Sequence, residues 1–115
     1  MKSPITTHVL DTSRGTPAVA LKAILEVSTG SKEWKELGRG ETNTDGRIAD
    51  FLRPGAGLEA GIYRITFLTG PYFRSTGVEG FYPSVVIQFE VKDPQSQYHV
   101  PLLLSPYGYS TYRGS

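Results

Sequence analysis

Apolar and polar residues alternate with a period of two along much of the chain, a pattern typical of strands that bury one face. The clearest alternation covers Gly61–Leu68, and the same pattern covers Ile5–Asp11. Within Ile5–Asp11 the residues expected on one face are Ile5, Thr7 and Val9, and those expected on the other are Thr6, His8 and Leu10. The pattern therefore predicts strands, and it places His8 on the same face as Thr6.

The stretch Ala20–Val27 is compatible with a helix or a strand on propensity alone. Pro17 and Gly30 bound it, and strand patterns lie on both sides of it, so a strand is favoured. The other predicted elements are strands over Trp34–Thr42 and Ser84–Val91, and one short helix within Pro71–Gly80, which is the only interval with room for a helix.

Tight turns are predicted where Asp, Gly and Pro interrupt the strands. One is Thr44–Arg47, which contains an Asp-Gly pair, and another is Asp93–Ser96. Ser105–Gly108 folds the last two strands back on each other, so the terminal Tyr112–Ser115 is expected to be tied into a sheet. Pro101 lies inside the first of these two strands and cannot donate a ladder hydrogen bond, so we expect it at a bulge or facing no partner.

Seven or eight short strands separated by turns predict an all-β, antiparallel β-sandwich with one short helix. The chain has 115 residues, the usual size of one domain, and it contains no internal repeat or linker-like segment. We therefore expect a single domain over residues 1–115.

Composition narrows the range of functions. The formal net charge is +1, which gives no basis for binding nucleic acid or an acidic membrane surface. No cysteine is present, which excludes disulfides, thiolate metal sites and cysteine nucleophiles. No apolar run approaches the roughly 20 residues needed to span a bilayer, and no signal peptide is visible. A cytoplasmic or peroxisomal location is expected, although the chain does not end in the peroxisomal Ser-Lys-Leu address.

His8 and His99 are the two histidines of the chain, and both lie in predicted strands. Histidine titrates near neutral pH and can exchange a proton at little cost, so the pair is a candidate for acid–base chemistry. The alternative is that each is an ordinary surface or core histidine. A zinc site is disfavoured because structural zinc takes four protein ligands and catalytic zinc three, and no carboxylate accompanies either histidine at ligand spacing.

Arg47 and Arg113 have two interpretations, a solvated arginine or a fixed cation that stabilises an oxyanion. Tyr112 and Ser115 offer hydroxyls at the terminus, but no Gly-x-Ser-x-Gly elbow supports a serine nucleophile. No phosphate-binding loop or dinucleotide-binding glycine pattern occurs either. The closing tyrosines are expected to serve packing and interfaces, because no basic patch accompanies them. The residues alone thus predict a sandwich with a His/His/Arg site and an ordered C-terminus.

Several motifs, taken together, indicate a known protein family. They are His8–Asp11 with Arg14–Gly15 and Pro17–Ala18, then Thr44–Arg47, Gly61–Tyr63, and the closing hairpin Tyr98–Ser115. Over nearly its whole length the chain resembles the transthyretin-related protein family, in its 5-hydroxyisourate hydrolase branch, and the terminal Tyr-Arg-Gly-Ser is that family's signature. The enzyme branch has histidine, arginine and histidine where His8, Arg47 and His99 stand. The thyroid-hormone carriers have lysine, glutamate and threonine there and lose the terminal signature.

The resemblance implies a transthyretin-like fold and a homotetramer, a dimer of dimers, with the first strand and the last two lining its channel. It implies ring-opening hydrolysis of 5-hydroxyisourate to 2-oxo-4-hydroxy-4-carboxy-5-ureidoimidazoline in urate breakdown, without a metal or organic cofactor. The implied catalytic residues are His8, Arg47, His99 and Ser115, and those expected to bind substrate are His8, Arg47, Tyr112 and Ser115. Which histidine is the base is left open. The alternatives are a carrier of an aromatic small molecule and a plain interaction module.

Overall fold

The computed structural model describes residues 3–115, which form nine strands and one helix. Two of the strands contain only two residues each, which is why the sequence predicted seven or eight. The elements are β1 (Ile5–Asp11), β2 (Thr16–Pro17), β3 (Lys22–Ser28), β4 (Trp34–Glu41), β5 (Arg47–Ile48), β6 (Gly61–Phe67), α1 (Thr69–Ser75), β7 (Val85–Val91), β8 (Tyr98–Ser105) and β9 (Gly108–Thr111).

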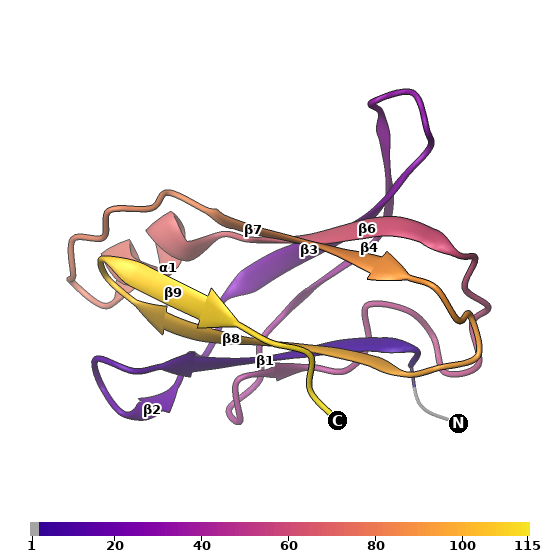
Figure 1. Ribbon diagram of the computed structural model, residues 1–115. Coiled ribbons are helices and arrows are strands. Elements are labelled where there is room, and N and C mark those ends of the chain that lie inside the picture. The colour runs from indigo at the N-terminus through magenta and orange to yellow at the C-terminus, as the bar shows by residue number, and fades with distance from the viewer. Residues whose placement is uncertain (1–2) are drawn as a thin grey trace.

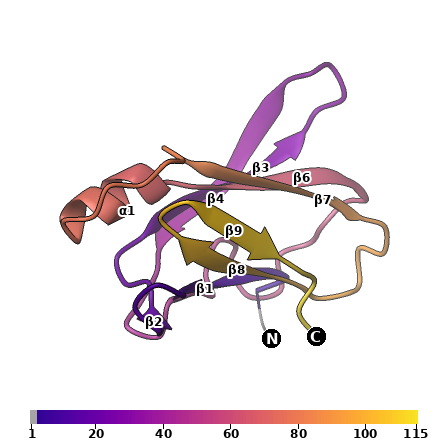
Figure 2. The same ribbon diagram turned by 60° about the vertical axis from the view of Figure 1, so that its left-hand side comes forward.

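The strands form two sheets that lie face to face, as Figures 1 and 2 show. One sheet has the order β2-β1-β8-β9, with β5 also paired to β1, and the other has the order β4-β3-β6-β7. The β3–β4 hairpin extends beyond the sandwich, and α1 lies at one end of it. The sandwich and its short helix confirm the fold class predicted from the sequence.

Within residues 3–115 the strands pair in antiparallel fashion, as predicted, in every pair but one. β1 and β8 run parallel, and their register pairs Ile5 with Tyr98 and Asp11 with Leu104. A parallel pair needs a long connection between its strands. All of the second sheet lies between β1 and β8 in the sequence and supplies that connection. Alternation within each strand says which face is buried but not the direction of a partner far away in sequence.

The core lies between the two sheets and is built from the inward-facing residues of the alternating strands. β1 has the burial pattern expected from its sequence, with Ile5 and Val9 fully buried and His8 half-buried on the opposite face. Burying each large apolar side chain contributes about 1.5–3 kcal/mol. The largest fully buried apolar side chains are Phe67, Ile5, Leu21, Leu25, Ile48, Ile65, Leu102 and Leu104.

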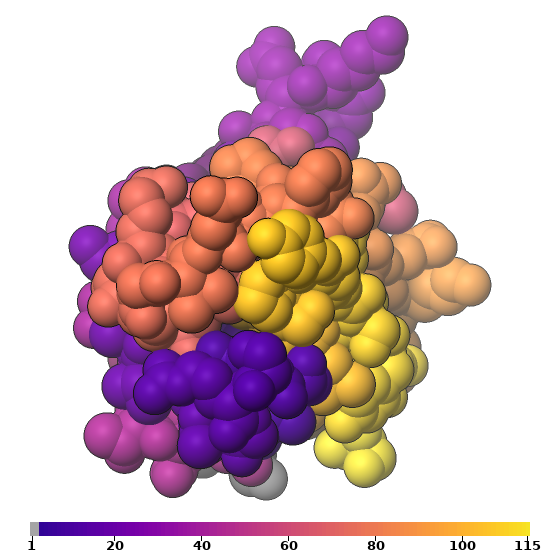
Figure 3. Space-filling view, turned by 90° about the vertical axis from the view of Figure 1, so that its left-hand side faces the viewer, coloured from indigo at the N-terminus to yellow at the C-terminus, as the bar shows by residue number. Residues whose placement is uncertain are grey.

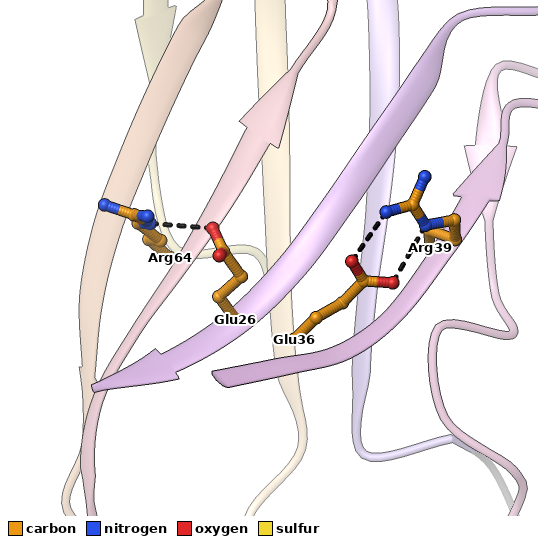
Figure 4. Close-up of polar contacts among 4 residues, drawn as sticks. All are labelled: Glu26, Glu36, Arg39 and Arg64. Carbon is orange, nitrogen blue, oxygen red and sulfur yellow. Dashed lines mark hydrogen bonds and ion pairs between the residues drawn. The ribbon is translucent and has the colours of Figure 1, made fainter. Parts of the chain in front are cut away.

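The outward face of the second sheet carries paired charges, shown in Figure 4. Glu26 accepts a hydrogen bond of 2.8 Å from Arg64, whose guanidinium also lies 4.0 Å from the centre of the Trp34 ring. Glu36 pairs in the same way with Arg39 at 2.6 Å, on an exposed part of β4. Exposed pairs contribute little to stability. Each of these arginines is nevertheless paired with a glutamate, so neither guanidinium is free to bind an anionic ligand.

Helix α1 is anchored to the end of β1 through a buried hydrogen bond. The Tyr72 hydroxyl donates to Oδ2 of Asp11 at 2.8 Å, and Asp11 is only 1% exposed. The other carboxylate oxygen, Oδ1, accepts from the Ser13 hydroxyl at 2.7 Å and from two backbone N–H groups. Burial, together with the neighbouring Asp11 carboxylate, raises the pKa of Tyr72 to about 12.

This anchor predicts a loss of stability at alkaline pH. The Tyr72 pKa is higher in the folded state than in the unfolded chain, where it is about 10, so folding favours the neutral phenol. Its contribution is therefore complete below pH 10 and declines as pH rises toward 12, by roughly 1.4 kcal/mol per unit. The Tyr72→Phe variant should lose less stability between pH 8 and 11 than the wild type, measured by urea unfolding. Tyr107→Phe, at a 68% exposed position, is the matched control; equal losses in the wild type and Tyr72→Phe would contradict the prediction.

Candidate active site

A tight turn places Arg47 directly opposite His8. The turn is closed by the Gly46 N–H, which donates to the Asn43 carbonyl at 2.9 Å, while the Asn43 side chain accepts from the Arg47 N–H at 3.0 Å. Gly46 has φ of +77°, and a Cβ there would lie 2.5 Å from the Val9 carbonyl oxygen. Only glycine fits at this left-handed position so close to β1. The turn predicted at Thr44–Arg47 is thus confirmed, and β5 pairs Arg47 with His8.

His99 enters the same surface from β8. Its register partner in β1 is Thr6, so the two side chains lie on the face that also carries His8. The His99 Nδ1 and the Thr6 hydroxyl are 2.8 Å apart, within hydrogen-bonding distance. Two strands that pair in parallel thereby bring together histidines that lie 91 positions apart in the chain.

Pro101 behaves as expected for a residue without an N–H. It pairs with His8 across the parallel register, but the ladder between β8 and β9 stops at Leu102–Thr111, so Pro101 has no partner in β9. The Thr111 hydroxyl instead donates to the Pro101 carbonyl at 2.7 Å. The proline therefore marks the point where the regular β8–β9 hairpin ends and the terminal residues begin.

The C-terminal residues return to β8 after this interruption. The Gly114 N–H donates to the His99 carbonyl at 2.8 Å and forms an isolated antiparallel bridge, which confirms that the terminus is tied into a sheet. Figure 3, which views the molecule from one end of the sandwich, shows the C-terminal part of the chain (yellow) next to its N-terminal part (indigo). The bridge holds Ser115 at the surface formed by β1, β5 and β8.

These elements enclose a cleft of about 540 Å³. Its lining residues are Thr6, Thr7, Arg47, Ile48, Ala49, Gln97, Tyr98, His99 and Ser115. Three of the five residues predicted as a site, Arg47, His99 and Ser115, thus line one cleft. His8 lies beside it, between Arg47 and Pro101 in the sheet.

Tyr112 does not line this cleft. It is 59% exposed and borders a separate groove of about 260 Å³ between β7 and the β8–β9 hairpin, together with Arg113. The Arg113 guanidinium lies 4.6 Å from the centre of the Tyr98 ring. The family resemblance implied that Tyr112 and Ser115 share one pocket, whereas in this chain they border two different hollows.

Thr6 is the site residue that sequence reasoning did not assign. The alternation of β1 did place it on the same face as His8, which was the available signal. Its contact with His99 depends on the parallel register of β1 and β8, and nothing in the sequence indicated that register.

The surroundings of His99 change the pKa of its side chain. Burial lowers the pKa of its imidazole, and the positive charges of Arg47 and of His8 lower it further, while a backbone hydrogen bond with Thr6 acts in the opposite direction. The imidazole is therefore held neutral near pH 7 and is able to accept a proton. Neither ion pair found within residues 3–115 involves Arg47, so its guanidinium is available to an anionic group.

Within residues 3–115 there is no cluster of three or more His, Cys, Asp or Glu residues suited to hold a metal ion. The same residues include no helix that is long and apolar enough to cross a membrane. The cleft does contain an imidazole and a guanidinium, groups that are able to accept a proton and to stabilise an oxyanion.

A two-sheet sandwich with one short helix, bearing a His/Arg/His cluster on the outer face of β1, β5 and β8, defines a protein of the transthyretin-like class. Residues 5–114 match the HIUase/Transthyretin family, and the chain belongs to that family. It is 50% identical to 5-hydroxyisourate hydrolase 2 of Rhizobium meliloti, over 96% of this chain and 95% of the relative.

Two solved structures show whether the fold alone distinguishes a 5-hydroxyisourate hydrolase from a transthyretin. The 5-hydroxyisourate hydrolase of Klebsiella pneumoniae superposes with a TM-score of 0.84 at 39% identity, covering 98% of this chain and all of that one. Sea bream transthyretin in complex with thyroxine superposes with a TM-score of 0.89 at only 28% identity, covering 97% and 95%. The backbone therefore fits both kinds of protein, and the residues of the site have to distinguish between them.

Proposed function

We propose that this protein hydrolyses 5-hydroxyisourate. The observation that carries the proposal is the grouping of His8, Arg47 and His99, in which burial and the neighbouring Arg47 and His8 lower the pKa of His99. The relatives that share 42–50% of its sequence over 96–98% of this chain bear the name of that activity. A carrier has no need for a neutral imidazole beside an unpaired guanidinium.

The reaction is attack of water on a ring carbonyl, followed by cleavage of the adjacent C–N bond. A neutral imidazole, from His99 or His8, takes a proton from the attacking water as its oxygen bonds to the carbonyl carbon. The carbonyl oxygen becomes an oxyanion, which the Arg47 guanidinium stabilises. The ring nitrogen then leaves with a proton returned by an imidazole, giving the carboxylate and ureido groups of 2-oxo-4-hydroxy-4-carboxy-5-ureidoimidazoline. Ser115 positions the water or the substrate through its hydroxyl or its terminal carboxylate. Tyr112 borders a separate groove of the same chain, so its part in substrate binding depends on the assembly of several chains.

The active form that we propose is a homotetramer, a dimer of dimers. β7 and β9 are the outer strands of their sheets and lie on the same side of the sandwich. Unpaired strand edges readily pair with another chain. Three tyrosines of the closing hairpin are exposed, namely Tyr107 (68%), Tyr109 (44%) and Tyr112 (59%). A second copy docked at these edges would cover them and bring Tyr112 near a cleft.

The second candidate is a carrier of an aromatic ligand, which the likeness to the thyroxine complex of sea bream transthyretin favours. A single experiment separates the two. Freshly prepared 5-hydroxyisourate is followed by ultraviolet absorbance with and without the protein, since the substrate also decays unaided, and thyroxine binding is measured in parallel. Accelerated ring opening supports the enzyme; thyroxine binding with decay at the blank rate would replace the enzyme by the carrier.

The lowered pKa of His99 predicts how the rate depends on pH. The base works only when neutral, and its folded pKa lies below the usual 6.5. We therefore expect kcat/KM to be level between pH 7 and 8 and to fall as pH drops below 6.5 through the lowered pKa. Circular dichroism at each pH separates loss of the base from unfolding. A level profile from pH 5 to 8, with chemistry limiting, would contradict a histidine base.

A further inference from the structure

The Gly114 backbone lies so close to the His99 ring that a side chain at position 114 would collide with it. A Cβ built on Gly114 would lie 2.5 Å from Cδ2 of His99, 3.1 Å from Cγ and 3.3 Å from Cβ. A carbon–carbon separation of 2.5 Å is well inside van der Waals distance, so the space beside the imidazole leaves no room for a side chain at position 114. Gly114 does not have a left-handed φ. Glycine is therefore needed here for space and not for backbone conformation.

The same imidazole is held at its other side by Thr6. The Thr6 hydroxyl is 2.8 Å from Nδ1, which leaves Nε2 as the ring nitrogen available to a substrate or a water molecule. In an imidazole ring Nε2 is bonded to Cδ2, the ring atom nearest to a Cβ built on Gly114. A displacement of the ring at Cδ2 consequently moves the one nitrogen that is free to accept a proton.

We propose that Gly114 is a positioning residue for His99, and that the absence of a side chain at position 114 sets the place of the reactive Nε2. The inference rests on the proposed function, and it gives the terminal segment a role beyond supplying Ser115. The bridge from the Gly114 N–H to the His99 carbonyl fixes the backbone on both sides of the contact. A methyl group at position 114 must therefore displace either the ring or the terminus.

Gly114→Ala tests this role, with Gly108→Ala as the matched control. Gly108 lies in the same closing hairpin, has no left-handed φ, and a Cβ there would meet only the Ser105 hydroxyl, at 3.7 Å. A misplacement of about 1 Å costs on the order of 10²-fold in rate. We expect Gly114→Ala to lower kcat by about that factor with little change in KM, and Gly108→Ala to match the wild type.

A readout independent of catalysis is the NMR titration of the imidazoles, which is simple because the chain has two histidines. Gly114→Ala should shift the His99 ring resonances and their midpoint while leaving those of His8 nearly unchanged. If the wild type proved to have no hydrolase activity, the proposed function would fail but this shift would still be expected. Wild-type resonances together with wild-type kcat in Gly114→Ala would overturn the proposal.

If Gly114→Ala destabilises the fold, the same substitution in a variant that lacks the His99 ring identifies the cause. Because the clash is with the His99 side chain, the thermal midpoint lost in Gly114→Ala should be largely absent when the substitution is made in a His99→Ala background. An equal loss of midpoint in both backgrounds would assign Gly114 to backbone structure alone and would overturn the positioning role.

Discussion

His99→Ala should lower kcat/KM for 5-hydroxyisourate by about 10²–10⁴-fold, the usual contribution of a general acid–base group. The imidazole is half-buried in a surface strand and faces the cleft, not the core between the sheets. Its removal should therefore leave the fold intact, with a change in unfolding free energy of about 1 kcal/mol. Steady-state rates and urea unfolding of the same preparation provide the two measurements.

His99→Gln is the sharper variant, because its amide can still bond the Thr6 hydroxyl but cannot take a proton at neutral pH. A loss as large as that of His99→Ala assigns the effect to proton transfer. A rate close to the wild type in the folded His99→Gln variant would remove His99 as the base. His8→Ala, measured beside it, should also lose much of the activity, because His8 pairs with Arg47 next to the cleft.

The pH dependence of these variants distinguishes the base from its partner. If His99 is the base, His8→Ala keeps a fall in rate at acid pH, and its midpoint moves up because one of the positive charges that lower the pKa of His99 is gone. In His99→Ala the residual rate should no longer fall with the same midpoint. The opposite pattern would make His8 the base and His99 the group that orients the substrate.

Local features of this fold could be predicted from the sequence because they arise from neighbouring residues. The alternation of β1 gave its buried and outward faces, the Asp-Gly pair gave the turn before Arg47, and Pro106 with Gly108 gave the final hairpin. The single interval without strand signals gave the helix, although α1 begins two residues before the predicted interval and ends at Ser75. Each of these patterns is complete within about ten residues.

Features that depend on distant segments could not be predicted in the same way. The parallel pairing of β1 with β8 brings Thr6 to His99, but no residue in either strand specifies that direction. β2 and β5 are too short to show a period. Tyr112 and Ser115 are close in sequence, yet the chain passes between them from one hollow to another. The site residues came from the family resemblance, and the structure supplied their spatial relation.

Deleting Tyr112–Ser115 should reduce hydrolysis by at least about 10²-fold, the effect expected when positioning groups are lost. The deletion removes Ser115 from the cleft and the Gly114 bridge from the backbone of His99. It leaves the four residue pairs of the β8–β9 ladder in place, and none of the deleted residues belongs to the buried core. The truncated chain should therefore still fold and keep its assembly.

The measurements for the truncated protein are turnover, mass by light scattering, and thyroxine binding. Removal of Ser115 alone is the matched control, since it retains the Gly114 bridge. It should lower the rate less than the full deletion does if the terminus also positions His99.

Loss of Tyr112 should open the proposed channel, so larger aromatic ligands should bind the truncated tetramer more tightly. Residues appended after Ser115 should lower activity as well, because they would enter the cleft. Full hydrolase activity in a truncated tetramer would contradict the role given to the terminus, and with it much of the reason for preferring an enzyme to a carrier.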